Sequence, residues 1–171
     1  MRWPIQVCAA LLVAATFVGC AATRSGGLPE DEEQMTSSEI PRLDDVARKY
    51  DRTLAELRDA ISRAQPDGEW SALGEAELSP GDESIAGPTA TRRFSEIWML
   101  SAPIDQGSRA TLLDELAEPA QRAGFGEFVI FVDQPGAFEA QALDEFGGEL
   151  RFATADTTVV RYVTGSHPTG E

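Results

Sequence analysis

The sequence predicts an α+β protein, a small two-layer α/β sandwich preceded by an amphipathic helix and acidic linkers. Three observations support this fold class. Apolar residues recur every three or four positions over 41–64, which is the period of a helix. From residue 92 onward, strand-like apolar runs alternate with helix-like segments, as in α/β sandwiches. The stretches that flank the 41–65 helix are acidic and contain many turn-forming residues, which indicates linkers.

The N-terminus has the layout of an export signal. Arg2 precedes an unbroken run of apolar and small residues from Val7 to Val18, and Gly19 stands directly before Cys20. A short basic region, an apolar core and a small residue at the cleavage point define such signals. The segment resembles the lipobox of bacterial lipoproteins. This resemblance implies that residues 1–19 are a cleaved signal peptide and that acyl chains such as palmitate on Cys20 attach the protein to the lipid bilayer.

The same resemblance implies a location outside the cytoplasm. In Gram-negative members of the family, an Asp after the cysteine retains the protein in the inner membrane. Here that position is Ala21, so the outer membrane facing the periplasm is expected if the cell is Gram-negative. An ordinary cleaved signal peptide and an uncleaved anchor are the alternatives, although the apolar run is short for a membrane span, which needs about 20 residues.

The composition excludes several classes of function. The chain has 29 acidic and 14 basic residues, a net charge of −15, which repels nucleic acid. Catalytic triads need a positioned imidazole, and zinc sites need His or Cys. The single histidine, His167, lies in residues 166–171, which are predicted to be a disordered tail, and Cys8 would leave with the signal. We therefore expect no enzyme, no metal and no cofactor, with carboxylate-only catalysis as the one open exception.

Residues 20–40 are predicted to be a lipidated, flexible and acidic tether, because they contain too few apolar residues to order. The next segment, 41–65, is predicted to be a helix with a heptad stripe. The apolar and small residues of the stripe are Leu43, Ala47, Tyr50, Leu54, Leu57, Ile61 and Ala64. Such a stripe either packs on its own domain or forms a coiled coil with another chain. From it we expect an envelope protein partner that binds through residues 41–64.

Residues 66–91 are predicted to be a second acidic linker, broken by two Pro/Gly pairs. The α/β domain is predicted over 92–165 in the order β-α-β-α-β-β. Its expected elements are a strand at 94–102, a helix at 108–123, a strand at 128–132, a helix at 137–146, and strands at 150–153 and 158–164. The strand at 128–132 is apolar throughout, which is typical of a central strand covered on both faces.

Two acids, Asp105 and Asp133, come just after predicted strands. If these strands are parallel neighbours, both carboxylates lie at the ligand-binding edge of the sheet. They could then share a cation, hold an amino group or act as an acid/base pair. Alternatively, each Asp caps a turn through local hydrogen bonds. Trp98 and Tyr162 are expected to pack in the core or cover a sheet face, with an aromatic ligand platform as the alternative.

The predicted topology is similar to the peptidoglycan-binding domain of outer membrane protein A. Asp133 after the 128–132 strand matches that family's diaminopimelate-binding Asp. The family's Asn, Leu-Ser pair and Arg on the following helix are missing from residues 137–144, so the match is partial. The sequence therefore favours a non-catalytic binding or assembly module of the cell envelope. The alternative is a cell-wall or small-ligand-binding domain that uses Asp105 and Asp133.

Overall fold

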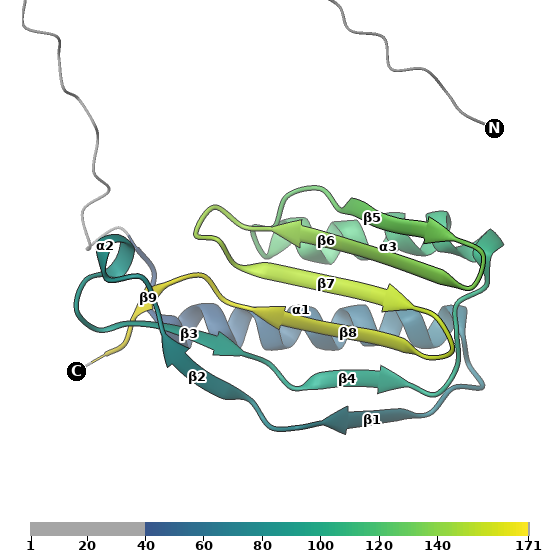
Figure 1. Ribbon diagram of the computed structural model, residues 1–171, viewed down its shortest axis with the longest axis horizontal. Coiled ribbons are helices and arrows are strands. Elements are labelled where there is room, and N and C mark those ends of the chain that lie inside the picture. Colours follow the sequence, from purple (N-terminus) through teal and green to yellow (C-terminus); the bar gives the residue numbers. More distant parts are fainter. Residues whose placement is uncertain (1–39, 171) are drawn as a thin grey trace, which may run out of the picture. The chain divides into compact units, whose positions relative to one another are not determined.

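Two helices lie against one face of an antiparallel sheet, and the opposite face is open (Figure 1). The computed structural model describes residues 40–170. The longer helix, α1 (Leu43–Ala64), lies behind the middle of the sheet, and α3 (Arg109–Arg122) lies beside it behind the β5–β6 end. This arrangement confirms the predicted α+β class with an N-terminal helix.

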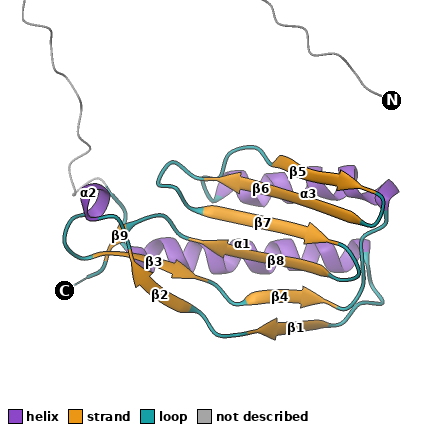
Figure 2. Ribbon diagram, in the orientation of Figure 1, coloured by secondary structure: helices purple, strands orange, loops and turns teal. Residues whose placement is uncertain are grey.

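Every strand pair in the sheet is antiparallel. The main path has the strand order β1-β4-β8-β7-β6-β5, while β3 pairs with β2, β8 and β9. A short helix α2 connects β2 to β3, and a 3-10 helix η1 leads from β4 into α3 (Figure 2). The bounds of these elements are β1 (Trp70–Leu73), β2 (Glu77–Pro80), α2 (Glu83–Ala86), β3 (Ala90–Phe94), β4 (Ile97–Leu100), η1 (Gln106–Ser108), β5 (Val129–Gln134), β6 (Ala137–Leu143), β7 (Glu149–Thr154), β8 (Thr158–Val163) and β9 (His167–Pro168).

The apolar stripe of α1 is buried within its own domain. Leu57 is 1% exposed and Ile61 is fully buried, and both belong to the core that α3 and the sheet share. Of the predicted stripe residues only Ala64 is exposed. A coiled coil along this stripe is therefore excluded, because the side chains that it requires already pack on the sheet. A partner of residues 41–64 stays a prediction and could contact only the outer face of the helix.

Two buried tyrosines connect the helix layer to acidic side chains. Tyr50 of α1 donates a hydrogen bond to Asp144, and Tyr162 of β8 donates one of 2.6 Å to Asp51 of α1. The rings meet edge to face, with centroids 5.5 Å apart. Burial, followed by these carboxylate contacts, raises the pKa of both hydroxyl groups above the ordinary value. Both tyrosines therefore remain neutral donors and fix the position of α1 on the sheet.

Residues 66–91 do not form the predicted linker. They contain β1, β2, α2 and the start of β3, and β1 pairs with β4 while β2 pairs with β3. Most of their side chains are exposed, so these strands depend on backbone hydrogen bonds to their neighbours. The pattern of apolar residues in 66–91 does not predict this strand pairing, because it depends on neighbouring strands rather than on local sequence. The predicted strand at 94–102 is likewise split into β3 and β4 at Ser95 and Glu96.

The predicted helix at 137–146 is wrong, because this segment forms β6. Its side chains alternate: Phe138, Ala140 and Ala142 are buried, whereas Glu139 and Gln141 lie on the open face. The Ala, Glu and Gln residues favour helix locally, but the two-residue period and the sheet contacts decide the structure. Without a helix after Asp133, the resemblance to the outer membrane protein A domain lacks its topological basis.

The run at 128–132 is not in a central strand. It contributes most of β5, which pairs only with β6 and forms the edge of the sheet. The hairpin turns through Pro135 and Gly136, and Gly136 has a φ of +82°, a conformation that favours glycine. No strand within residues 40–170 pairs with the second side of β5. By contrast, the predicted hairpin near the C-terminus is confirmed as β7 and β8.

The predicted disordered tail at 166–171 is also wrong over its described part. His167 lies in β9, pairs with Thr91 and is fully buried. Its Nδ1 donates a hydrogen bond of 3.0 Å to the carbonyl oxygen of Pro41, and its Nε2 is buried with no partner among the described residues. The imidazole is therefore neutral, and burial lowers its pKa.

Substitution of a stripe residue should destabilise the domain itself. Leu57→Ala is expected to lower the free energy of unfolding by about 2–5 kcal/mol, because it leaves a cavity between α1 and the sheet. Leu78→Ala is the matched control, since Leu78 is 66% exposed, and it should change stability by less than about 0.5 kcal/mol. Urea denaturation of the full chain measures both. Equally small effects would contradict the packing of α1.

Protonation of His167 should destabilise the fold. Because the folded pKa lies below the unfolded value of about 6.5, the unfolded state binds more protons between the two values. Stability is therefore complete above about pH 6.5 and falls as the pH drops toward the folded pKa, by at most about 1.4 kcal/mol per pH unit. Melting temperatures of the full chain and of His167→Gln, measured across this range, test the effect. Parallel curves for the two proteins would show that His167 has no such role.

Candidate functional site

The two acids predicted to form a site are not on neighbouring strands. β4, which precedes Asp105, and β5, which contains Asp133, are separated by β8, β7 and β6. Asp105 is the residue directly before η1, and its side chain makes no capping hydrogen bond to this helix. No hydrogen bond or ion pair within residues 40–170 joins the two carboxylates. The predicted shared edge site therefore lacks the strand geometry on which it was based, and a role for either acid stays a prediction.

Asp133 lies beside a buried arginine. Its carboxylate is 3.7 Å from Nη1 of Arg109, which is only 6% exposed at the start of α3. The same Nη1 donates hydrogen bonds of 3.1 Å to the carbonyl oxygens of Gln134 and Ala137. Arg109 thus fixes the β5–β6 turn onto α3, and Asp133 balances the buried charge. Sequence reasoning missed this contact, because it joins segments that are far apart in the chain.

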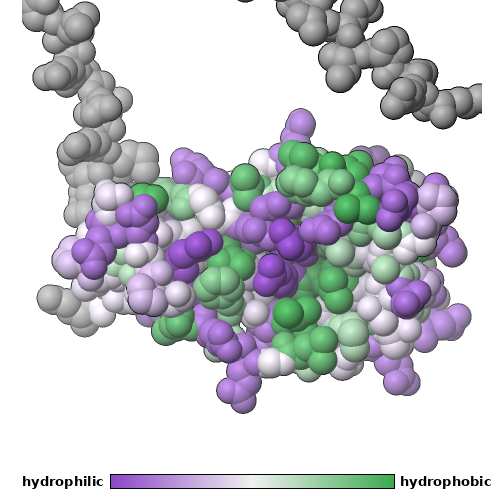
Figure 3. Space-filling model, viewed as in Figure 1, coloured by the Kyte–Doolittle hydropathy of each residue, from purple (hydrophilic) through white to green (hydrophobic). Residues whose placement is uncertain are grey.

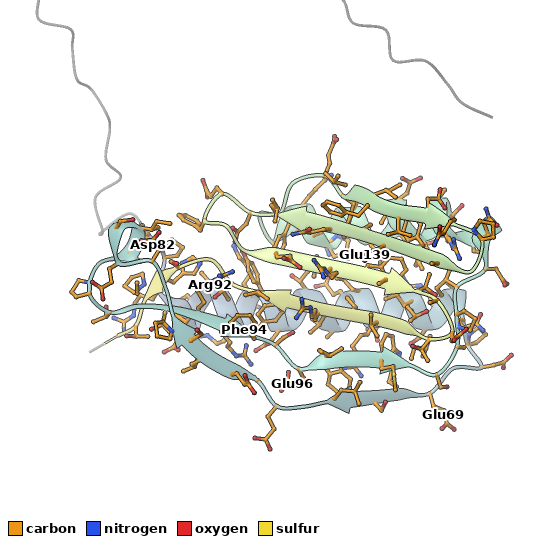
Figure 4. The ribbon with its side chains drawn as sticks, in the orientation of Figure 1. Glu69, Asp82, Arg92, Phe94, Glu96 and Glu139 are labelled. Carbon is orange, nitrogen blue, oxygen red and sulfur yellow. The ribbon has the colours of Figure 1, made fainter. Side chains whose placement is uncertain are left out.

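The middle of the open face carries a row of charges. Arg151 of β7 lies between Glu139 and Glu149, with nitrogen–oxygen distances of 3.4 and 2.9 Å. On the next strand, Arg161 is directly opposite Arg151. Figure 3 shows this hydrophilic band crossing the face between two hydrophobic areas, and Glu139 is labelled on it in Figure 4. The band makes the centre of the open face polar.

The edge of the sheet formed by β5 exposes apolar side chains to solvent. Four large side chains, which we call the β5 edge patch, are each about half exposed or more: Val129 (58%), Ile130 (49%), Phe131 (61%) and Leu143 (55%). Figure 3 shows hydrophobic surface over β5. Exposed adjoining apolar side chains of this kind mark interaction sites on soluble domains.

A β-bulge directs part of this patch outward. The β5–β6 register shifts between Ile130 and Val132, so Phe131 has no partner on β6. Bulges commonly redirect a side chain or protect an edge strand. Residues 128–132 contain no charge, so charged side chains do not protect this part of the edge, and Asp133 is the one charged residue of β5. The uncharged run is visible in the sequence, but its edge position depends on the hairpin that follows.

A shallow apolar hollow adjoins β5 on the open face. Its volume is about 250 Å³, and it exists because alanines stand between larger side chains. The residues that line it are Val132, Ala137, Phe138, Glu139, Ala153, Thr154, Ala155, Thr157 and Val159. The apolar surface at this end of the molecule therefore extends from the edge onto the open face.

Nothing in the described part of the chain forms a metal site of clustered His, Cys, Asp or Glu residues. Cys20, the predicted lipidation site, lies outside the described residues. No helix within residues 40–170 has the length and apolar character needed to cross a membrane.

Comparisons with known proteins give a family and a fold. Residues 21–167 match the family described as LppA, a lipoprotein confined to pathogenic Mycobacterium. The crystal structure of LppA from Mycobacterium tuberculosis is similar, with a TM-score of 0.63 and 12% identity over 80% of this chain and 83% of that chain. A DUF4853 family protein from Actinomyces odontolyticus has a TM-score of 0.56 and 14% identity over 78% and 73% of the two chains. At these identities the likeness shows the fold alone. A comparison with curated proteins gives no match.

Proposed function

The chain belongs to the LppA family of lipoproteins, and from this premise we propose that it is a lipid-anchored, non-catalytic binding or assembly module of the cell envelope. Membership in a lipoprotein family implies a membrane-anchored protein outside the cytoplasm. Beyond family membership, we propose that the lipid is attached to Cys20 and that the β5 edge patch binds a partner.

We place the lipid on Cys20. The family match begins at residue 21, directly after this cysteine, and an acylated cysteine at the start of the mature chain is the anchor that the lipobox implies. One acyl chain gives only marginal membrane binding, and stable anchoring needs more than one signal. The proposed anchor therefore carries several acyl chains.

The binding role is supported by the β5 edge patch. Its side chains are apolar and exposed, and three of them are consecutive on β5, although that strand could have carried polar residues at these positions without loss to the core. A protein partner fits this patch better than a lipid surface does, because the net charge of −15 repels anionic headgroups. Edge strands also present unpaired backbone groups that a partner strand can bind. We therefore propose that the patch docks an envelope protein.

Loss of the acylated cysteine should release the protein. Cys20→Ala is expected to block lipid attachment and to move the chain from the membrane fraction to the soluble fraction, or to leave it unprocessed at a higher apparent mass. Cell fractionation with immunoblotting measures this, and Cys8→Ala is the matched control, with no expected change. Membrane retention of a processed Cys20→Ala protein would contradict the proposed anchor.

A charge in the patch should abolish partner binding. A photo-crosslinking amino acid at Ile130 is expected to give one predominant protein adduct in cells, and Phe131→Asp should reduce that adduct at least about tenfold, since a desolvated charge costs more than 1.4 kcal/mol. Leu78→Asp is the control, because Leu78 is equally exposed but lies on β2. An adduct that survives Phe131→Asp, or that Leu78→Asp removes equally, would overturn the assignment of this surface.

A further inference from the structure

A second small hollow lies on the helix side of the molecule, away from the β5 edge patch. Its volume is about 210 Å³, and it is bounded by α1, β3, β4 and the turn between these two strands. Glu96 is labelled in that turn in Figure 4. The residues that line the hollow are Asp51, Leu54, Ala55, Arg58, Arg93, Glu96 and Trp98.

Arg58 is held against two tryptophans at one side of this hollow. Its guanidinium carbon is 3.4 Å from the ring centroid of Trp98 and 5.2 Å from that of Trp70. The Trp70 indole is itself fixed by a hydrogen bond of 2.8 Å that its Nε1 donates to the hydroxyl of Ser62. These contacts hold the guanidinium beside the two indole rings.

The charge of Asp59 acts on Arg58, but no carboxylate within residues 40–170 forms an ion pair with it. The Nε of Arg58 is buried and has no hydrogen-bond partner among these residues. Desolvation lowers its pKa below the ordinary value, but an arginine still remains charged. A partly buried cation with an unsatisfied donor is costly unless an anion or acceptor reaches it.

The neighbouring charges limit what that anion can be. Nη1 of Arg93 donates hydrogen bonds of 2.9 Å to both carboxylate oxygens of Asp51, so this pair forms a neutral wall. Glu96 adds a negative charge at the rim. A ligand with several negative charges would be repelled by Glu96 and by Asp59, whose charge also acts on Arg58, whereas a single carboxylate needs only the one positive charge of Arg58.

We propose that this hollow binds a ligand with a single carboxylate group and an apolar body. The contact with Trp98 leaves the terminal Nη1 and Nη2 groups of Arg58, which unlike Nε are not among the buried atoms without a partner, available to a ligand. This end of the guanidinium matches a carboxylate through two parallel hydrogen bonds. Leu54, Ala55 and the edge of Trp98 provide apolar contact for the remainder of the ligand. The site is independent of the β5 edge patch and of the proposed envelope partner.

Tryptophan fluorescence can test the site directly, because Trp70 and Trp98 both contact Arg58. Trp3 is the one other tryptophan in the sequence and lies in the predicted signal peptide, so the processed, lipid-anchored chain in detergent would carry only these two. Sodium benzoate is expected to change the fluorescence saturably, with a dissociation constant of about 10 mM or below, the weak end of measurable affinity. Benzamide, the neutral analogue of the same shape, should give no saturable change, and inorganic phosphate should bind at least about tenfold more weakly, a difference of 1.4 kcal/mol.

Variants of Arg58 assign the effect to this residue. Arg58→Gln should weaken benzoate binding at least about tenfold, Arg58→Lys should weaken it less, and Arg52→Gln, an exposed arginine on the same helix, should leave it unchanged. Melting curves establish that each variant is folded. Saturable binding of benzamide, undiminished binding in folded Arg58→Gln, or no saturable binding of benzoate to the parent protein would each overturn the proposal.

Discussion

The packing of α1 on the sheet is the interaction on which the other features of this domain depend. The stripe residues Leu54, Leu57 and Ile61 supply the centre of the core, and the hydroxyl groups of Tyr50 and Tyr162 fix the orientation of the helix through two acids. With α3 beside it, α1 covers one face of the sheet. Two helices on one side cannot cover the other face or the edge, so those surfaces remain for solvent and partners. The pairing of β9 with β3 and the His167–Pro41 hydrogen bond join the C-terminal segment to the start of α1.

The sequence predicted well those features that depend on local period. The predicted helix at 41–65 differs from α1 by two residues at its N-terminus and one at its C-terminus, and the predicted apolar side is the buried one. A spacing of three and four residues that continues over twenty-two residues fits few structures other than a helix. The predicted strands at 150–153 and 158–164 form the hairpin of β7 and β8, in which Leu150, Phe152, Val160 and Tyr162 alternate toward the core. The helix at 108–123 also formed, and it continues through Pro119. In these segments the local pattern and the tertiary contacts favour the same structure.

The misses have a common cause, since each depended on contacts between distant segments. Ala140 and Ala142 favour helix by themselves and became strand because β7 pairs with them. The run at 128–132 was assigned to the sheet centre because its residues are apolar, yet its position depends on the turn at Pro135 and Gly136. The acids Asp105 and Asp133 were grouped on the assumption of adjacent parallel strands, whereas Asp133 balances Arg109. Arg58 could not be singled out, because its significance depends on Trp70 and Trp98, which lie on other elements.

Hydrogen–deuterium exchange of the full-length, lipid-anchored protein tests the central claim most directly, namely that α1 is an internal layer and the β5 edge is the binding surface. Amide exchange would be compared between native envelopes and the detergent-purified protein. We expect slow exchange of Leu43–Ala64 in both samples, and slower exchange of Val129–Gln134 in envelopes than in detergent. Protection of α1 that appears only in envelopes, or equal exchange of β5 in the two samples, would show that these two assignments are wrong.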